Sequence, residues 1–150
     1  MRFLTVRLVQ VGILWFSTLA AACSSVIDAS FSAEGTYQLA MYNGATVPAR
    51  LFPLPPSPSN HQSSGCWYVA ARGSLVLQGG HFRYSEAFED SCTNAVLFEG
   101  EIGGNYAQDG RNLSFTVPGL GTVGTFTGTA DGRDVTIRPD EDERTYRKLQ

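Results

Sequence analysis

Three cysteines and two histidines are the residues of this 150-residue chain that are best suited to covalent chemistry or to binding a transition metal. Cys23 closes a short apolar segment, whereas Cys66 and Cys92 lie far downstream in strand-like sequence. A thiol can carry a lipid, close a disulfide or bind a metal, but neither His61 nor His81 has partners at the spacing of a zinc site. The sequence also lacks a serine-nucleophile elbow, a phosphate-binding loop and a dinucleotide-binding fingerprint. We therefore expect no enzymatic activity, no catalytic residue, no metal and no cofactor.

The first 22 residues resemble the signal peptide of bacterial lipoproteins. Two arginines precede an apolar stretch at residues 8–16, and small residues then precede Cys23. The apolar stretch is shorter than the ~20 residues of a membrane span, so we expect residues 1–22 to be cleaved. The resemblance implies a lipid on Cys23, and the absence of an aspartate after it implies the outer membrane, facing the periplasm or the exterior. The alternative is an ordinary secretory signal cut after Ala22, because three alanines also form a small-x-small cleavage pattern.

The composition of the remaining chain restricts its partners and its architecture. Residues 23–150 carry nine basic and 14 acidic side chains, a formal charge of −5, so we expect no nucleic-acid partner. Residues 23–34 are small and polar and predict a flexible tether, which leaves residues 35–150 as one domain with one core. No part of that domain carries a convincing apolar stripe with helical period, which favours strands.

Four dipeptides divide the domain at the points where hairpins would turn: Asn43-Gly44, Gly79-Gly80, Asp109-Gly110 and Asp131-Gly132. The segments between them alternate apolar with polar residues. An antiparallel meander with one apolar face must close on itself or pack on another sheet. We therefore predict an all-β, up-and-down barrel of eight or nine strands. The predicted strands lie near residues 35–42, 45–50, 66–78, 81–91, 95–107, 111–118, 122–130, 133–139 and 143–148.

Folding each hairpin about its dipeptide places apolar residues opposite one another, as a correct register requires. With a further turn at Leu120-Gly121, the predicted pairs are Leu77 with Phe82, Leu75 with Tyr84, Tyr106 with Leu113, Ile102 with Val117, Phe126 with Ile137, and Phe115 with Phe126.

The register of the first long hairpin also brings the two downstream cysteines close together. Extending that hairpin pairs Trp67 with Cys92, so a small bulge would bring Cys66 opposite Cys92, as a disulfide needs. Two free thiols or a metal pair are the alternatives. Between the second and third predicted strands, residues 51–65 contain four prolines, which predicts an irregular insert across one mouth of the barrel.

Several short motifs resemble the lipocalin-like lipoproteins of bacteria, which are small calycin-type barrels. They are Gly35-Thr36-Tyr37-Gln38-Leu39, Asn43-Gly44, Val47-Pro48, Gly73-Ser74-Leu75-Val76-Leu77, Gly124-Thr125-Phe126-Thr127-Gly128, Thr145-Tyr146-Arg147-Lys148 and the cysteine pair. The resemblance covers nearly the whole domain. In lipocalins a tryptophan in the opening motif is covered by an arginine of the last strand. Here Tyr37 stands in the tryptophan position, and the resemblance implies that Arg147 or Arg144 covers it.

The predicted interior is rich in aromatic residues, which can hold a ligand or simply fill the barrel. Glu86 shares that face, where it would contact a ligand or act as an acid, unless a bulge turns it outward. The candidate ligand contacts are Tyr37, Trp67, Phe82, Tyr84, Glu86, Phe98, Tyr106, Phe126 and Arg147.

Two functions are compatible with these features. The first is a lipid-anchored envelope protein whose lipocalin-like barrel binds a small apolar molecule. The second is a structural or protein-interaction lipoprotein with a filled core, for example an inhibitor of a hydrolase such as lysozyme, for which the acidic run at residues 140–143 would be a contact surface. The fold alone does not distinguish them.

Overall fold

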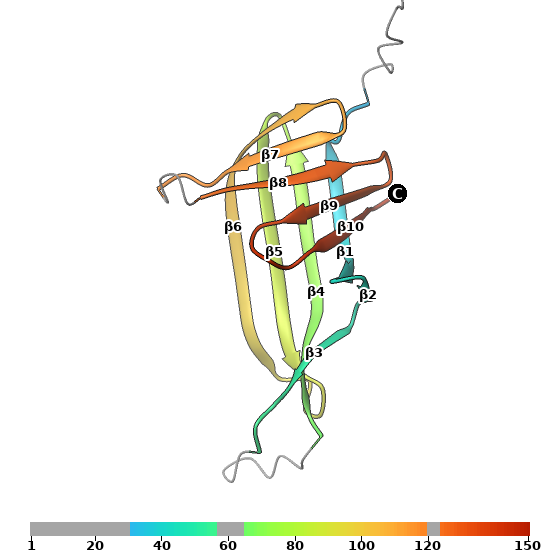
Figure 1. The fold of residues 1–150 in the computed structure, drawn as a ribbon, viewed down its shortest axis with the longest axis vertical. Coiled ribbons are helices and arrows are strands. Elements are labelled where there is room, and N and C mark those ends of the chain that lie inside the picture. The colour runs from blue at the N-terminus through green and yellow to red at the C-terminus, as the bar shows by residue number, and fades with distance from the viewer. Residues whose placement is uncertain (1–30, 57–64, 120–123) are drawn as a thin grey trace, which may run out of the picture.

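The computed structural model describes residues 31–56, 65–119 and 124–150, and it is all-β, as the sequence predicts (Figure 1). Three sets of predicted features lie outside these residues: the signal segment with Cys23, most of the proline-rich insert with His61, and the turn at Leu120-Gly121. In the described part of the chain, no helix has the length and apolarity that a membrane span needs.

The strands follow the predicted ranges closely, except that the second predicted strand is split in two. Their bounds are β1 (Gly35–Tyr42), β2 (Ala45–Thr46), β3 (Ala49–Pro53), β4 (Trp67–Gln78), β5 (His81–Asp90), β6 (Val96–Asp109), β7 (Asn112–Thr116), β8 (Thr125–Ala130), β9 (Asp134–Arg138) and β10 (Arg144–Lys148).

One antiparallel sheet contains all ten described strands, and it closes because β1 pairs with both β10 and β4. Closure makes an eight-stranded barrel, and β2 and β3 lie outside the ring as two additional strands. The closing contact is short, running from Gly35 opposite Leu77 to Gln38 opposite Ser74.

The closed part of the barrel is filled by side chains. Phe115 stacks on Phe126 with ring centroids 4.6 Å apart, and Phe82 meets both rings edge to face. Phe115 also packs over Gly128, where a Cβ atom would lie 2.5 Å from the carbonyl oxygen of Thr136. The small residue therefore permits close approach of a ring and a strand, and the aromatic residues of this half form a core.

The predicted hairpin registers are right at two turns and wrong at two others. Leu77 pairs with Phe82, Leu75 with Tyr84 and Phe115 with Phe126, as expected. Tyr106 instead pairs with Phe115, and Ile137 pairs with Gly128. The first hairpin turns at Gly110-Arg111 and the second through the four residues 131–134, so both registers move by two residues. A shift of two keeps every side chain on its predicted face.

The disulfide between Cys66 and Cys92 is present, and a bulge in β4 produces it. Arg72 pairs with Ala87 and Ala70 with Phe88, which leaves Ala71 as the extra residue. The shifted register brings the two cysteine Cα atoms to 5.4 Å. The same bulge exchanges the faces of the residues below it, so the expectation that Trp67 points into the barrel is wrong. Trp67 lies on the outer face, with the guanidinium of Arg50 5.8 Å from its ring.

The two ends of the barrel differ in how many strands enclose them. In Figure 1, β4, β5 and β6 run the full height of the molecule, whereas β1 and β7–β10 surround only the upper half. In the lower half β3 takes the place of β1 beside β4, with Ala49 opposite Ala70 and Pro53 opposite Trp67. We call the upper half the closed end and the lower half the open end.

Residues 31–34, which the sequence places in the tether, pack on the closed end. Ala33 is fully buried, and its backbone amide donates to the side chain of Gln108, which in turn donates to the carbonyl of Phe31. The Tyr37 hydroxyl donates to the Ala33 carbonyl at 2.6 Å. Residues 31–34 therefore pack with the domain instead of belonging to the expected tether.

Candidate binding site at the open end of the barrel

Four aromatic rings from four neighbouring strands form a continuous row at the open end. Phe52 of β3 stacks on Tyr68 of β4 with centroids 4.8 Å apart, and Tyr68 stacks on Phe88 of β5 at 5.0 Å. Phe98 of β6 continues the row 6.0 Å from Phe88. Of the two central rings, Phe88 is buried and Tyr68 is partly buried, whereas the end rings Phe52 and Phe98 are 52% and 51% exposed. We call this row the aromatic ladder. It is a row of apolar rings that water still reaches at both ends.

A cavity of about 500 Å³ opens beside the ladder. Phe52, Tyr68 and Phe88 form one wall, and Tyr42 meets Phe88 edge to face at 5.9 Å. Asn43 and Asp142 supply polar groups at the rim. Its size is in the range of sites for small organic molecules, and its walls combine aromatic rings with polar groups that include Arg50.

Arg144 does not line the cavity, but it forms hydrogen bonds with two residues that do, Tyr42 and Asp142. Its side chain is 3% exposed, and its Nε donates to Glu86 Oε2 at 3.0 Å. Nη1 and Nη2 donate to the two carboxylate oxygens of Asp140 at 2.6 and 3.0 Å. The guanidinium also lies 4.8 Å from the ring centroid of Tyr42, whose hydroxyl donates to Asp142. We call these five residues the Arg144 cluster.

The ionisation of the Arg144 cluster is set by these contacts. Burial alone would lower the pKa of Arg144, but hydrogen bonds to Asp140 and Glu86 raise it, so the guanidinium stays charged. Hydrogen bonds from Asn43 and Tyr42 lower the pKa of Asp142 below its usual value. Burial, together with the hydrogen bond to Asp142, raises the pKa of Tyr42, which stays a neutral donor. The cluster therefore contains a charged guanidinium and an ionised Asp142 at neutral pH.

Glu86 faces the interior of the barrel, as expected from strand alternation. The bulges at Ala71 of β4 and Leu97 of β6 do not reverse its direction, because both lie nearer the open end than Glu86 does. Its carboxylate is bound by Arg144 and also forms a hydrogen bond with Tyr84. Burial and that bond raise the pKa of Tyr84. Glu86 is thus part of a buried ion pair. The nearby hydroxyl of Tyr146 is buried without a hydrogen-bond partner among the described residues.

The candidate ligand residues fall into three groups. Tyr37, Phe82, Tyr84 and Phe126 are buried in the closed end and pack with its core, with Tyr106 at the margin. Phe98 and Glu86 reach the open end. Trp67 and Arg147 lie outside the barrel, where Arg147 pairs with Asp134 at 3.0 Å.

The cation over the aromatic ring of the opening motif is neither of the two expected arginines. Lys148 Nζ lies 5.6 Å from the ring centroid of Tyr37, whereas Arg144 covers Tyr42. Tyr37 pairs with Lys148 across β1 and β10, while Arg147 alternates to the outer face. Because side chains alternate between the two faces of β10, Lys148 and not Arg147 covers the ring of Tyr37.

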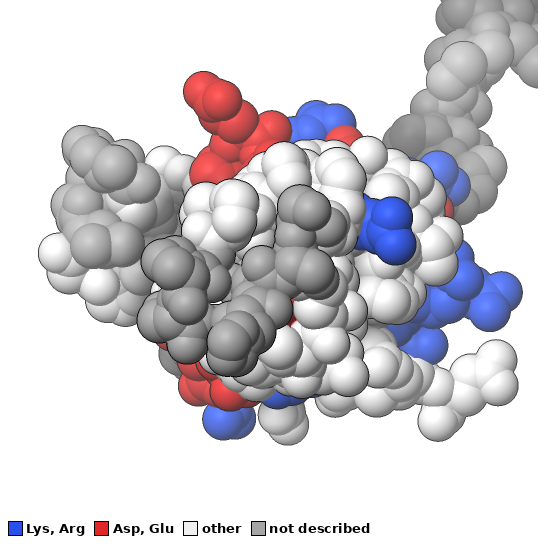
Figure 2. All heavy atoms as spheres, turned by 90° about the horizontal axis from the view of Figure 1, so that it is seen from below, with Lys and Arg blue, Asp and Glu red and all other residues white. Residues whose placement is uncertain are grey.

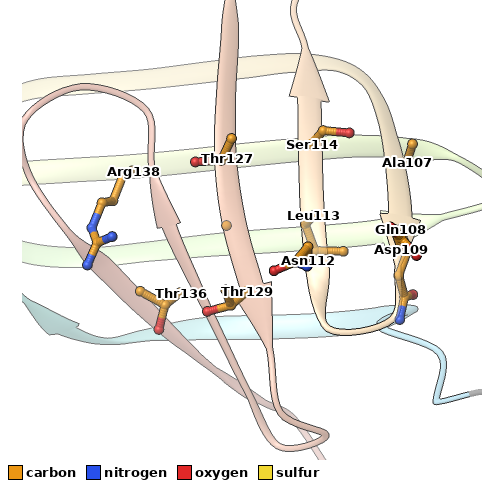
Figure 3. A pocket seen from close by; sticks show the side chains of 11 residues that line it. Ala107, Gln108, Asp109, Asn112, Leu113, Ser114, Thr127, Thr129, Thr136 and Arg138 are labelled. Atoms are coloured by element: carbon orange, nitrogen blue, oxygen red, sulfur yellow. The ribbon is translucent and has the colours of Figure 1, made fainter. Parts of the chain in front are cut away.

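A second cavity, of about 410 Å³, lies on the outer face of β6–β9 (Figure 3). Ser114, Thr127, Thr129 and Thr136 project their hydroxyl groups there, and Arg138 lies at one side. These residues belong to the face that the alternation of the sequence predicts to be solvated. The hollow contains no aromatic ring on which a flat ligand could stack.

Sequence reasoning missed Tyr42, Phe52, Tyr68 and Phe88 as a group, because only the Ala71 bulge brings Tyr68 onto the face of Phe88. One signal in the sequence could have indicated the site: Arg144 lies two residues from Tyr146, so alternation places this charged side chain on the same inner face.

Comparisons of the chain with protein-family models, with curated proteins and with solved structures each returned no match.

Proposed function

We propose that this protein is a binding protein of the cell envelope, anchored by a lipid on Cys23, that holds a small apolar or aromatic molecule at the open end of its barrel. The observation that carries the proposal is the aromatic ladder beside a cavity of about 500 Å³. Aromatic rings bind flat apolar molecules by stacking and by burial of surface, at roughly 1.5–3 kcal/mol for a buried side chain of that size.

The position of the site follows from the packing of the two ends. The rings of the closed end pack against one another, as in the stacked pair Phe115 and Phe126, and so are not available to a ligand. The ladder has rings that are half exposed, and two members of the Arg144 cluster, Tyr42 and Asp142, line the cavity beside it and supply polar groups. A ligand with an apolar plane and one polar substituent fits both features.

A neutral fluorescent probe, N-phenylnaphthylamine, tests the ligand site. Titrated into the domain of residues 23–150, the probe should bind saturably and accept energy from Trp67, which is the only tryptophan of that part of the sequence. Phe52→Ala should weaken binding about tenfold, since truncating a stacked ring costs about 1.4 kcal/mol. The matched control is Leu149→Ala, because Leu149 is also half exposed but lies away from the ladder. If Phe52→Ala and Leu149→Ala changed the affinity for the probe equally, the aromatic ladder would not be the binding site.

The anchor has its own test in cells that process lipoproteins. The wild-type chain should fractionate with membranes and incorporate labelled palmitate, and Cys23→Ala should lose both properties. A membrane-bound, unlabelled wild-type protein would remove the anchor from the proposal and leave the ligand site untouched.

A further inference from the structure

The lower part of β6 has a free edge. On one side, β6 pairs with β5 along its length, from Val96 to Asn105. On the other side β7 pairs only with the upper residues, from Asn105 to Asp109. Among the described residues, no strand pairs with that side below Asn105. Because Leu97 is a bulge, the regular free edge is Phe98–Ile102.

The opposite edge of the same three-stranded region is already extended. Beside β4, β1 pairs with residues 74–77 and β3 pairs with residues 67–70, so the open end keeps a strand there after β1 has left. On the β6 side nothing among the described residues corresponds to β3. In an antiparallel strand every second residue directs its amide and carbonyl groups to the free side, and such groups accept another strand readily.

The other strand edges described above are very short or end at proline, and this one is neither. β2 is only two residues long, and β3 ends at Pro53, with Pro55 and Pro56 following. Short strands and prolines prevent edge-to-edge association. The segment Phe98–Ile102 contains neither proline nor lysine, and Phe98 and Ile102 expose apolar surface.

The charges beside this edge determine what can pair with it. Glu99 and Glu101 are exposed on the outer face of β6, and neither forms an ion pair with a described residue. Figure 2, which views the open end from below, shows acidic side chains gathered mainly on the left, which is the β6 side of Figure 1, and basic ones mainly on the right. A second copy pairing through β6 would place these glutamates opposite those of its partner, which destabilises a strand pair.

We propose that the edge at Phe98–Ile102 accepts an extended segment of another protein in which lysine or arginine alternates with apolar residues. The basic side chains pair with Glu99 and Glu101 on the outer face. The apolar side chains cover Phe98 and Ile102 on the inner face, and the backbone extends the sheet as β3 does at β4. The partner site shares Phe98 with the aromatic ladder, but the free edge and its two glutamates do not line the cavity of the small-molecule site.

The test uses the domain of residues 23–150 and a labelled peptide in which lysine alternates with valine, followed by fluorescence anisotropy. Glu99→Gln with Glu101→Gln should weaken binding about tenfold, from two cross-strand ion pairs of about 0.7 kcal/mol each. The matched control, Asp109→Asn with Glu141→Gln, removes the same charge from two exposed residues elsewhere and should leave the affinity unchanged. The peptide should also slow amide hydrogen exchange at alternate residues of Phe98–Ile102.

Two further peptides separate strand addition from charge attraction alone. A peptide alternating glutamate with valine should bind wild type weakly but should bind Glu99→Lys with Glu101→Lys well. A lysine-valine peptide methylated on alternate backbone nitrogens should not bind, because it cannot complete the ladder. Equal binding of the methylated peptide would overturn the proposal. So would a dimer of the domain, seen by sedimentation, whose β6 amides are protected without peptide.

Discussion

The closed and open ends of this barrel use the same kind of residue for opposite purposes. At the closed end Phe82, Phe115 and Phe126 contact one another and are buried. At the open end Phe52 and Phe98 belong to a row of rings just as continuous, yet half of each side chain is exposed. The difference comes from strand length, since β7–β10 are short and cover only the upper part of β4–β6. Aromatic content alone therefore does not locate a binding site, whereas enclosure does.

Alanine substitution of one ring from each end should give the largest contrast. Phe115→Ala should lower the free energy of unfolding by about 3–5 kcal/mol, because it leaves a cavity in a packed core. Phe52→Ala should lower it by less than about 1 kcal/mol, because the ring is half in water already. Denaturant unfolding measures both values, and similar losses for the two variants would mean that the ends are packed alike.

Arg144 lies where the two ends meet, and its removal should have the next largest effect. Arg144→Met leaves Glu86 without its cationic partner and should cost about 3 kcal/mol of unfolding free energy. Combining it with Glu86→Gln should recover part of that loss, because the uncompensated charge is then gone.

Arg147 provides the matched control for Arg144, since it lies in the same strand and also pairs with an aspartate. Its side chain is half exposed, so Arg147→Met should leave thermal stability nearly unchanged. If Arg147→Met proved as damaging as Arg144→Met, burial would not explain the importance of the cluster.

The smallest expected effect concerns pH at the rim of the open end. The pKa of Asp142 is lower in the folded protein than in the unfolded chain, so its ionised form stabilises the fold. That contribution is complete above about pH 4 and is lost as the pH falls through the lowered pKa. Asp142→Asn should therefore reduce stability by about 1 kcal/mol at pH 7, and the difference from wild type should shrink under acid conditions.

Thermal unfolding of both proteins between neutral and acid pH measures this difference. Glu141→Gln is the control, because Glu141 is exposed and has no hydrogen-bond or ion-pair partner among the described residues. A constant gap between wild type and Asp142→Asn at every pH would show that shape, not charge, accounts for the role of Asp142.

Local patterns in the sequence predict much of the fold. Alternation of apolar residues and the Gly79-Gly80 turn predict the β4–β5 hairpin correctly, because a two-residue turn determines its own register. Asp109-Gly110 misplaces the next turn by a residue, since Gly110 also serves as the first residue of a different two-residue loop. The faces survive this error, because side chains repeat every two residues.

The candidate site is harder to predict because it depends on irregularities and on distant pairings. One extra residue, Ala71, moves Trp67 outward and Tyr68 inward, and the sequence indicates only that some bulge would align the cysteines. The contact of Arg144 with Glu86 joins residues 58 positions apart. It depends on the closure of the barrel and not on any local motif.

The docking of residues 31–34 at the closed end has a consequence for how the molecule would stand on a membrane. Ala33 is held there by Gln108, and the amide of Gly79 donates to Glu34, so the polypeptide leaves the domain beside the upper hairpin turns. A lipid on Cys23, only a few residues upstream, would then place that end nearest the bilayer. The aromatic ladder and the unpaired stretch of β6 would then face away from the bilayer, where they would be accessible to dissolved molecules and to other proteins.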